Sequence, residues 1–481
     1  MIKMESKKTI SKTSAVVMTL LILFLCVQFI YSEDKDNPPL EEGIFLLKYR
    51  GIDSSDEELR INSWYGYASF FGPFTEGNAP PLSDFAKSLN LKADKIEYIQ
   101  NPNFKKSDYA VIEYQNNAPV ALYIDLNANG KLDEGEKILP ITRKDSQDID
   151  FLTPNFEMQS SDGKKYPYRY IIRSRGLGST MWGSSCVWEG KGKIEGKPYR
   201  IVLFDGSQDG DFTQFGNDSC MITPDEPKKN VSYNRTILSR IINLNNQFYK
   251  LNFSDDKTRL NIQKYTTPLG FLKTSFFAKS DMNIRNLYLT LNGATDSEVN
   301  FNIHPEISKT EKLPAMAYKL GNCSVEYGPQ EREKGWRLYF QGSNPLFEIK
   351  ADNTTELVLG EPKMKAQAID KNNRYRNPDK FETVYKKGAT VYISREIKGK
   401  LGEKYGLFVQ GNNWQEVEPQ VIIKDKTGKQ VYSGSMQFGG GSCGFSWKTQ
   451  DVNTGDYIID VTQDTGALAG ILKDTLTITI E

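Results

Sequence analysis

Histidine is nearly absent from this sequence, because His304 is the only one among 481 residues. Zinc proteases of the HExxH type, and all other metal sites with two histidine ligands, are therefore excluded. A histidine general base would have to be His304 itself. Because Pro305 follows it, we expect His304 to end a strand rather than to act in catalysis.

The sequence also has no excess of charge of one sign. Lysine and arginine together number 61, and so do aspartate and glutamate, which gives a net charge of zero. Proteins that bind nucleic acids carry a basic excess or a basic stripe. Neither occurs here, so no nucleic-acid partner is expected. The hydrophobic fraction of 38% indicates folded domains rather than a disordered chain.

The N-terminus has the pattern of an exported protein. Lys7, Lys8 and Lys12 precede an apolar run over residues 15–31. As a helix this run would reach about 25 Å, slightly less than the hydrocarbon core of a bilayer. The pattern predicts a signal peptide or an uncleaved N-terminal anchor over residues 1–32. Either one places the rest of the chain outside the cytoplasm, secreted or at the cell envelope, and only the anchor would contact a membrane.

Cysteines are few, and none has the CxxC spacing of zinc or thiol-redox sites. Four follow the N-terminal segment, at Cys186, Cys220, Cys323 and Cys443. An even number in an exported chain predicts disulfides, for which three pairings are possible. Cys186 with Cys220 is the preferred pair, because both flank the same predicted strand unit.

Short runs of aromatic and β-branched residues alternate with Gly, Asn and Asp turns through the rest of the chain, and predict an all-β, multi-domain fold. We expect a β-rich region over residues 33–238, a small β-sandwich over 239–375 and an immunoglobulin-like β-sandwich over 376–481. The C-terminal prediction depends on seven strand-like runs. These are residues 389–397, 405–410, 420–425, 430–438, 444–448, 456–462 and 476–480.

The most specific local pattern is a twelve-residue run that begins at Asp125. Oxygen-bearing side chains stand at positions 1, 3, 5, 9 and 12, glycine at position 6 and leucine at position 8. Calcium takes about six to eight oxygen ligands, on which alternate side chains of a sharply turning loop can converge. The predicted ligands are Asp125, Asn127, Asn129, Lys131 through its backbone carbonyl, Asp133 and Glu136.

A second loop repeats this arrangement 80 residues later. A strand-like run over residues 199–204 leads into oxygen-bearing side chains at positions 1, 3, 5 and 7, with glycine at position 6. Position 12 is a glycine, and the next acidic side chain lies two residues further. The predicted calcium ligands are Asp205, Ser207, Asp209, Asp211 and Asp218. For both loops the alternative is a surface turn without metal.

The run over residues 125–136 resembles the calcium loop of EF-hand proteins. Its scaffold differs from that family, because a strand-like run over residues 120–124 precedes it instead of a helix. A helix movement upon calcium binding is therefore not implied. Over most of its length the chain is also similar to uncharacterised exported bacterial proteins, in which such strand-and-loop units precede sandwich domains with a strand like residues 433–448. That resemblance implies an extracytoplasmic location and calcium, and no activity.

Together these patterns predict a secreted or surface-anchored calcium-binding structural or interaction protein. Its expected partners are calcium ions and cell-envelope components or another surface protein. An extracellular enzyme acting on glycans, or a glycan-binding adhesin, is the alternative. No catalytic residue is singled out. The GxSxG pattern at residues 440–444 fits a glycine-rich turn better than a nucleophile elbow, because a strand-like run follows it.

Overall fold

The computed structural model describes residues 40–52, 95–100, 109–126, 134–142, 149–160, 163–174, 176, 180–225, 235–278, 282–307, 309–329, 331–342, 346–370, 381–413, 415–439 and 442–481. Within these ranges the only helical elements are two 3-10 turns, η1 (Glu134–Glu136) and η2 (Arg332–Lys334). The same part of the chain has no helix of the length and hydrophobicity that a membrane span requires. The predicted all-β class is confirmed. The predicted export segment lies outside the described residues.

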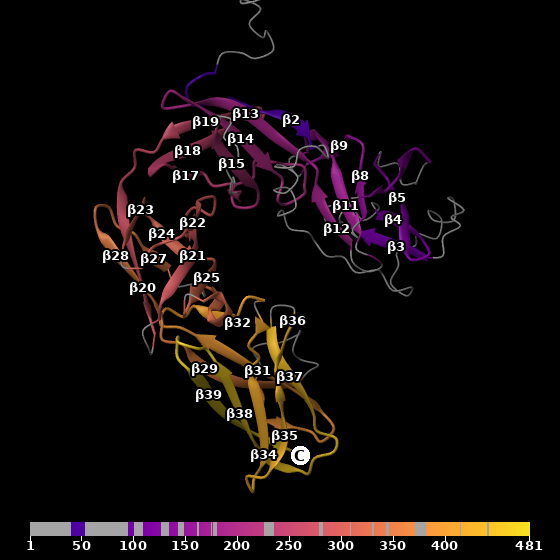
Figure 1. Cartoon of the computed structure of the whole chain (residues 1–481), viewed down its shortest axis with the longest axis vertical. Coiled ribbons are helices and arrows are strands. Elements are labelled where there is room, and N and C mark those ends of the chain that lie inside the picture. Colours follow the sequence, from indigo (N-terminus) through magenta and orange to yellow (C-terminus); the bar gives the residue numbers. More distant parts are fainter. Residues whose placement is uncertain are drawn as a thin grey trace, which may run out of the picture.

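Five sheets make up the N-terminal half of the described chain (Figure 1). Their strands, in pairing order, are β3 (Lys95–Gln100), β4 (Tyr109–Gln115), β5 (Ala118–Ile124) and β6 (Lys137–Ile138); β12 (Thr180–Ser184), β11 (Tyr170–Ser174), β8 (Ile149–Leu152) and β7 (Ile141–Thr142); β10 (Lys165–Tyr168) and β9 (Phe156–Gln159); β16 (Thr236–Ile237), β15 (Ser219–Pro224), β14 (Lys197–Phe204), β13 (Cys186–Ile194) and β2 (Lys48–Gly51); and β1 (Ile44–Leu46), β19 (Arg259–Lys264), β18 (Gln247–Phe253) and β17 (Ile241–Leu244). One large apolar core, which we call the first core, is shared by these sheets and extends from Phe45 to Ile262.

Two-residue turns close several of these hairpins. Asn116 and Asn117 join β4 to β5, and Asn245 and Asn246 join β17 to β18, each with a positive φ between 52° and 65°. Two successive residues with positive φ define the type I′ turn, whose twist matches that of the flanking strands. Asparagine tolerates this conformation better than most residues, so these turns follow directly from the sequence.

The remaining strands form three sheets. A three-stranded sheet contains β23 (Thr310–Pro314), β20 (Leu269–Phe277) and β28 (Thr354–Gly360). Nine strands of a twelve-stranded sheet follow one another in pairing order: β27 (Leu346–Glu348), β24 (Ala317–Leu320), β21 (Ile284–Gly293), β25 (Asn322–Tyr327), β26 (Trp336–Gln341), β32 (Lys404–Gln410), β31 (Thr390–Lys398), β37 (Ser442–Lys448) and β36 (Gln437–Gly439). The other three strands each pair with one of these: β22 (Asn300–Ile303) with β21, β29 (Lys363–Asp370) with β31, and β33 (Gln415–Glu416) with β32. A five-stranded sheet contains β30 (Val384–Tyr385), β39 (Ile471–Ile480), β38 (Gly455–Asp464), β34 (Gln420–Asp425) and β35 (Gln430–Ser435).

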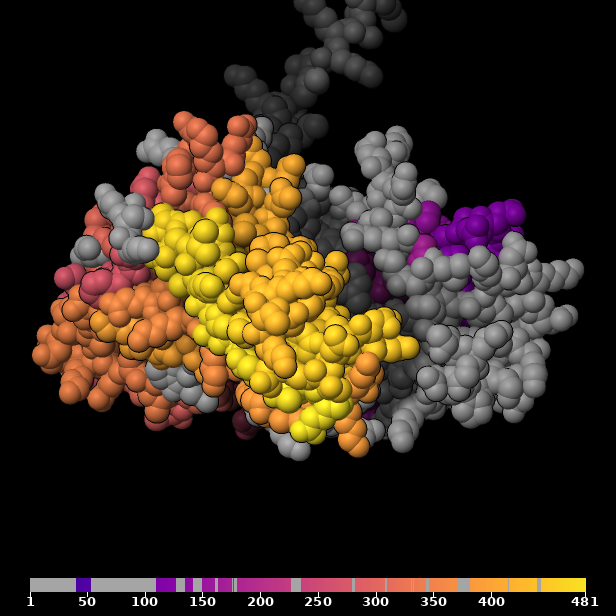
Figure 2. Space-filling view, turned by 90° about the horizontal axis from the view of Figure 1, so that it is seen from below, coloured from indigo at the N-terminus to yellow at the C-terminus, as the bar shows by residue number. Residues whose placement is uncertain are grey.

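The C-terminal strands form a sandwich. The five-stranded sheet and the C-terminal strands of the twelve-stranded sheet enclose a third core, which includes Ile393, Trp447 and Ile459. All seven predicted runs are strands, the fourth divided between β35 and β36. The predicted β-sandwich character is therefore confirmed. Figure 2 shows this sandwich, orange to yellow, facing the viewer when the molecule is seen from below.

Strand pairing in one place and core packing in another connect the predicted domains. Residues 44–51 form one extended segment, in which β1 pairs with β19 of one sheet and β2 pairs with β13 of another. A second core, which extends from Ile241 to Leu468, includes residues on both sides of residue 376. Strand pairing and packing therefore continue across the predicted boundaries at residues 239 and 376, and the division into domains stays a prediction.

Candidate functional site

The first predicted calcium loop connects the adjacent antiparallel strands β5 and β6. Leu122 pairs with Ile138 and Tyr123 with Lys137, so the two ends of the loop lie next to each other. Asp125 follows β5 directly and is 5% exposed, while Glu136 precedes β6 and is 6% exposed. The amide of Leu126 donates a hydrogen bond to Glu136 Oε1 at 3.0 Å. The structure thus brings the first and twelfth positions of the loop together.

The middle of this loop lies outside the described residues. It contains the other predicted ligands, Asn127, Asn129, Lys131 and Asp133. The loop ends in η1, a 3-10 turn that carries Glu136 toward the start of the loop. No helix precedes the loop, as the sequence indicated, because β5 leads directly into it.

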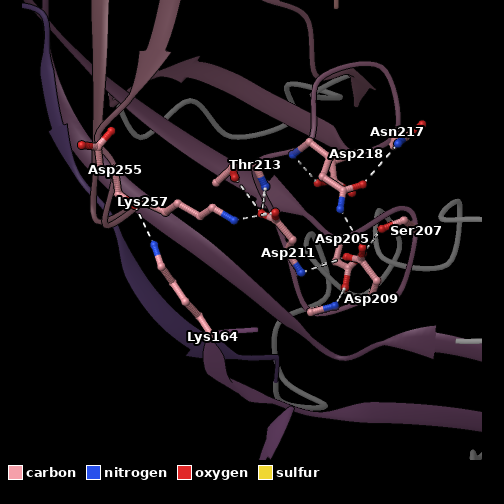
Figure 3. Close-up of polar contacts among 12 residues, drawn as sticks. Lys164, Asp205, Ser207, Asp209, Asp211, Thr213, Asn217, Asp218, Asp255 and Lys257 are labelled. Carbon is pink, nitrogen blue, oxygen red and sulfur yellow. Dashed lines mark hydrogen bonds and ion pairs between the residues drawn. The ribbon is translucent and has the colours of Figure 1, made fainter. Parts of the chain in front are cut away.

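The second predicted loop is described completely, and it connects the adjacent strands β14 and β15 (Figure 3). Asp205 is buried at its start and accepts four hydrogen bonds. Oδ2 accepts from the Tyr168 hydroxyl and the Gly210 amide, each at 2.8 Å. Oδ1 accepts from the Gln208 amide and from the Ser207 hydroxyl. These four bonds use the lone-pair sites of the carboxylate.

The other acidic side chains of this loop are also engaged. Asp218, fully buried, accepts from the amides of Gly206 at 3.0 Å and Gln214 at 2.8 Å. Asp209 accepts from the Asp211 amide and from the side-chain amide of Gln214. Asp211 accepts from Thr213 and forms an ion pair of 2.6 Å with Lys257. Figure 3 shows Lys257 reaching Asp211 from the turn between β18 and β19.

Burial sets the protonation behaviour of this loop. It raises the pKa of Asp205 to about 6, although hydrogen bonds from Gly210 and Tyr168 lower it. Burial also raises the pKa of Asp218 well above its ordinary value, and the neighbouring charge of Asp205 adds to that increase. Burial lowers the pKa of Arg235 to about 10, an effect that the charges of Asp218 and Asp205 oppose. Two neighbouring carboxylates are therefore held in a poorly hydrated site.

The geometry of the second loop does not fit a calcium site. All lone-pair sites of Asp205 are used by donors of the protein, and the Lys257 ammonium already neutralises Asp211. Among the residues that the structure describes, no group of three or more acidic, histidine or cysteine side chains is placed to hold a metal ion. The ligand set Asp205, Ser207, Asp209, Asp211 and Asp218 is brought together as a network of internal hydrogen bonds.

Sequence reasoning missed three residues around this loop. Tyr168 and Lys257 bond to its carboxylates, and the charge of Arg235 interacts with those of Asp218 and Asp205. Each comes from another strand or turn, and Lys257 is 46 residues from its partner Asp211. The loop sequence carries no signal for any of them, because their proximity depends on which strands pair.

The predicted disulfide between Cys186 and Cys220 is wrong. Both thiols are buried and free, as are those of Cys323 and Cys443. Strand β14 lies between β13, which carries Cys186, and β15, which carries Cys220. Two strand spacings amount to about 10 Å, whereas a disulfide requires Cα atoms within about 7 Å. Burial also raises the pKa of Cys220 to about 11, which keeps this thiol protonated.

The single histidine is exposed at the end of β22. Its Nδ1 lies 3.3 Å from Asn286 Oδ1, and its ring lies 5.1 Å from that of Tyr288. Among the described residues, no carboxylate forms an ion pair with it. Its position directly after β22 confirms the prediction that His304 ends a strand.

Comparison with known proteins does not assign the chain to a family. No known protein family matches the sequence, and no curated protein matches it. Among solved structures, the chain is similar to a leucine-rich repeat protein from Bacteroides thetaiotaomicron, with 8% sequence identity and a TM-score of 0.15. The similarity covers 45% of this chain and 25% of that protein, so the chain spans about a quarter of its length. A similarity at this level supports no conclusion about fold or function.

Proposed function

We propose that this protein is an extracytoplasmic structural or interaction protein that binds one calcium ion through the loop of residues 125–136. The observation that carries the proposal is the return of Glu136 to the start of its loop, where the Leu126 amide donates to Glu136 Oε1. A glutamate at this position can offer two oxygens to calcium. Asp125 and Glu136 are both buried, one at each end of the loop, and buried carboxylates commonly coordinate a metal ion or pair with another charge.

The ion would stabilise the loop rather than take part in a reaction. It would connect the end of β5 to the start of β6, and so fix one edge of the sheet β3-β4-β5-β6. Exported modules bind calcium with dissociation constants of about 10⁻⁴ to 10⁻³ M, which extracellular calcium satisfies. At a free concentration ten times the dissociation constant, one site contributes about 1.4 kcal/mol to the free energy of unfolding. The stabilised sheets would then present surfaces to cell-envelope components or another surface protein.

Calorimetric titration of the chelator-stripped protein with calcium tests this proposal. We expect about one ion per chain and a melting temperature that rises by a few degrees in saturating calcium. Asp125→Ala removes the first ligand and should abolish both effects.

Asp209→Asn is the control, because it changes an acidic side chain at position 5 of the second loop. The Asp209 oxygens accept hydrogen bonds from Asp211 and Gln214. This variant should bind calcium like the wild-type protein. Absence of binding by the wild-type protein, or equal binding by Asp125→Ala, would refute the proposal.

A further inference from the structure

A groove lies where the first and second cores meet. In β17 and β18, neighbouring residues turn toward different cores: Ile242 and Tyr249 are buried in the first core, and Ile241 and Phe248 in the second. Two adjoining depressions of about 420 and 520 Å³ occur beside these strands, and both are lined by Arg240 and Lys250. We call the two together the junction groove. Binding sites are frequent at such junctions between packed units.

Strand pairing builds the floor of the junction groove. Lys250 pairs with Ile241 on one side and with Gln263 on the other. All three line the smaller depression. Because side chains of directly paired residues share a face of the sheet, Lys250 and Gln263 point into the groove together. Asn252, two residues along β18, has the same orientation and lines the larger depression.

One cation in the junction groove has no acidic partner among the described residues. Arg240 forms ion pairs with Asp296 and Glu298, Lys257 with Asp211 at 2.6 Å, and Lys264 with Glu195 at 3.5 Å. Lys250 is exposed, and no described carboxylate pairs with it. Asp255 lines only the larger of the two depressions, whereas Lys250 lines both. A single ammonium group is thus available at the centre.

Aromatic rings line both depressions of the groove. Phe215 and Phe253 line the larger depression, with ring centroids 5.5 Å apart, and the Arg240 guanidinium lies 5.8 Å from the centre of Phe215. Tyr265 lines the smaller depression. All three rings are half-buried. Ring faces beside amide and ammonium donors suit a ligand that has apolar C–H faces and a rim of polar oxygens.

We propose that the junction groove binds an acidic oligosaccharide, with a uronate carboxylate at Lys250 and neighbouring sugar rings against Phe253 and Tyr265. Asn252 and Gln263 supply donors and acceptors for hydroxyl groups. A densely charged polyanion fits less well, because the other basic side chains of the groove are already neutralised by Asp296, Glu298, Asp211 and Glu195. A neutral oligosaccharide would leave the Lys250 charge without a partner.

Calorimetric titration of the whole chain with tetragalacturonate tests the proposal, with cellotetraose as the neutral probe and tetraglutamate as an acidic peptide. We expect tetragalacturonate to bind with micromolar to millimolar affinity and cellotetraose to bind roughly tenfold more weakly. Lys250→Met keeps the side-chain length and removes the charge, and should weaken tetragalacturonate binding roughly tenfold. Gln263→Ala, which removes an exposed amide, should weaken it severalfold.

Lys312→Met is the matched control, because Lys312 is an exposed strand lysine outside the groove. It should bind like the wild-type protein, and the melting curve of each variant reports whether it is folded. Absence of tetragalacturonate binding, unchanged binding by both groove variants, or preferential binding of tetraglutamate overturns the proposal. The titrations are carried out in the presence of a calcium chelator, so their outcome is separate from that of the calcium experiment.

Discussion

At the scale of single residues, the acidic side chains of the second loop are bonded by groups of the protein itself. Backbone amides and hydroxyl groups donate hydrogen bonds to the oxygens of Asp205, and the ammonium group of Lys257 forms an ion pair with Asp211. A bound cation and donor groups of the protein can each stabilise buried carboxylates, which otherwise cost several kcal/mol in free energy. The two similar sequences are therefore expected to differ in calcium dependence.

Asp205 and Asp218 predict an unusual dependence of stability on pH. The folded-state pKa of Asp205 is about 6, above the ordinary value of 3.8, so the folded protein binds this proton more tightly than the unfolded chain. The contribution of this pair to the free energy of unfolding is therefore largest below about pH 4 and decreases as the pH rises through 6. Asp218→Asn removes one of the two charges and should reduce this decrease.

Urea unfolding at pH values between 4.5 and 6.5 measures the effect. The comparison is the slope of the free energy of unfolding against pH in the wild-type protein and in Asp218→Asn. Hydrogen bonds hold the pKa values of Asp256 and Asp460 near 2. Their contributions to the free energy of unfolding are therefore lost only below this pH range. Parallel slopes for the two proteins would show that the pair is not the source.

At the scale of strands, local sequence determines much of the structure. The alternation of buried and exposed residues and the Asn-Asn turns are visible in the sequence, and all seven predicted C-terminal strands form. What local sequence does not contain is the pairing order. The interposed strand β14 makes the Cys186–Cys220 disulfide impossible, and only the position of the β18–β19 turn brings Lys257 to Asp211. The disulfide prediction was wrong and Lys257 was missed because both depend on that order.

Glycine on β13 allows two sheets to meet. A Cβ atom at Gly192 would lie 2.4 Å from the carbonyl oxygen of Ile44 in β1, and one at Gly190 would lie 2.6 Å from that of Leu46. Gly192→Ala must therefore push β1 away from β13, and we expect a loss of about 1–3 kcal/mol in the free energy of unfolding. Chemical denaturation of the variant and the wild-type protein measures the difference.

Gly183→Ala is the control for this prediction. Gly183 is also a buried strand glycine, but its added Cβ would make an ordinary contact of 3.6 Å with Ile171. We expect its free energy of unfolding to change by less than about 1 kcal/mol. Equal losses for the two variants would mean that the close approach of β1 is not what the glycine permits.

At the scale of the whole molecule, the middle and C-terminal regions share one continuous sheet. β26 pairs with β32, which pairs with β31. The buried carboxylate of Glu403 reinforces this junction, because it accepts hydrogen bonds from the Gly360 amide at 2.9 Å and the Tyr405 hydroxyl at 2.6 Å. The Tyr327 hydroxyl donates to the carbonyl of Thr465 at 2.9 Å. These regions are therefore expected to open together.

Leu338→Ala tests this coupling. Leu338 is fully buried on β26, and its truncation should cost about 2–5 kcal/mol in the free energy of unfolding. Hydrogen–deuterium exchange should then accelerate in residues 322–341 and also in residues 390–410, because both belong to the same cooperative unit. Acceleration confined to residues 322–341 would contradict the coupling.

The crossing segment of residues 44–51 has a consequence for biosynthesis. Ile44 pairs with Asn261, a partner that the ribosome adds more than 200 residues later. At about 5–20 residues per second, the first strand waits on the order of 10–40 s for its neighbour. A nascent or truncated chain that stops before β19 keeps that strand unmatched, which makes it a substrate for proteases and holdase chaperones. A chain still in synthesis therefore has no native pairing between β1 and β19.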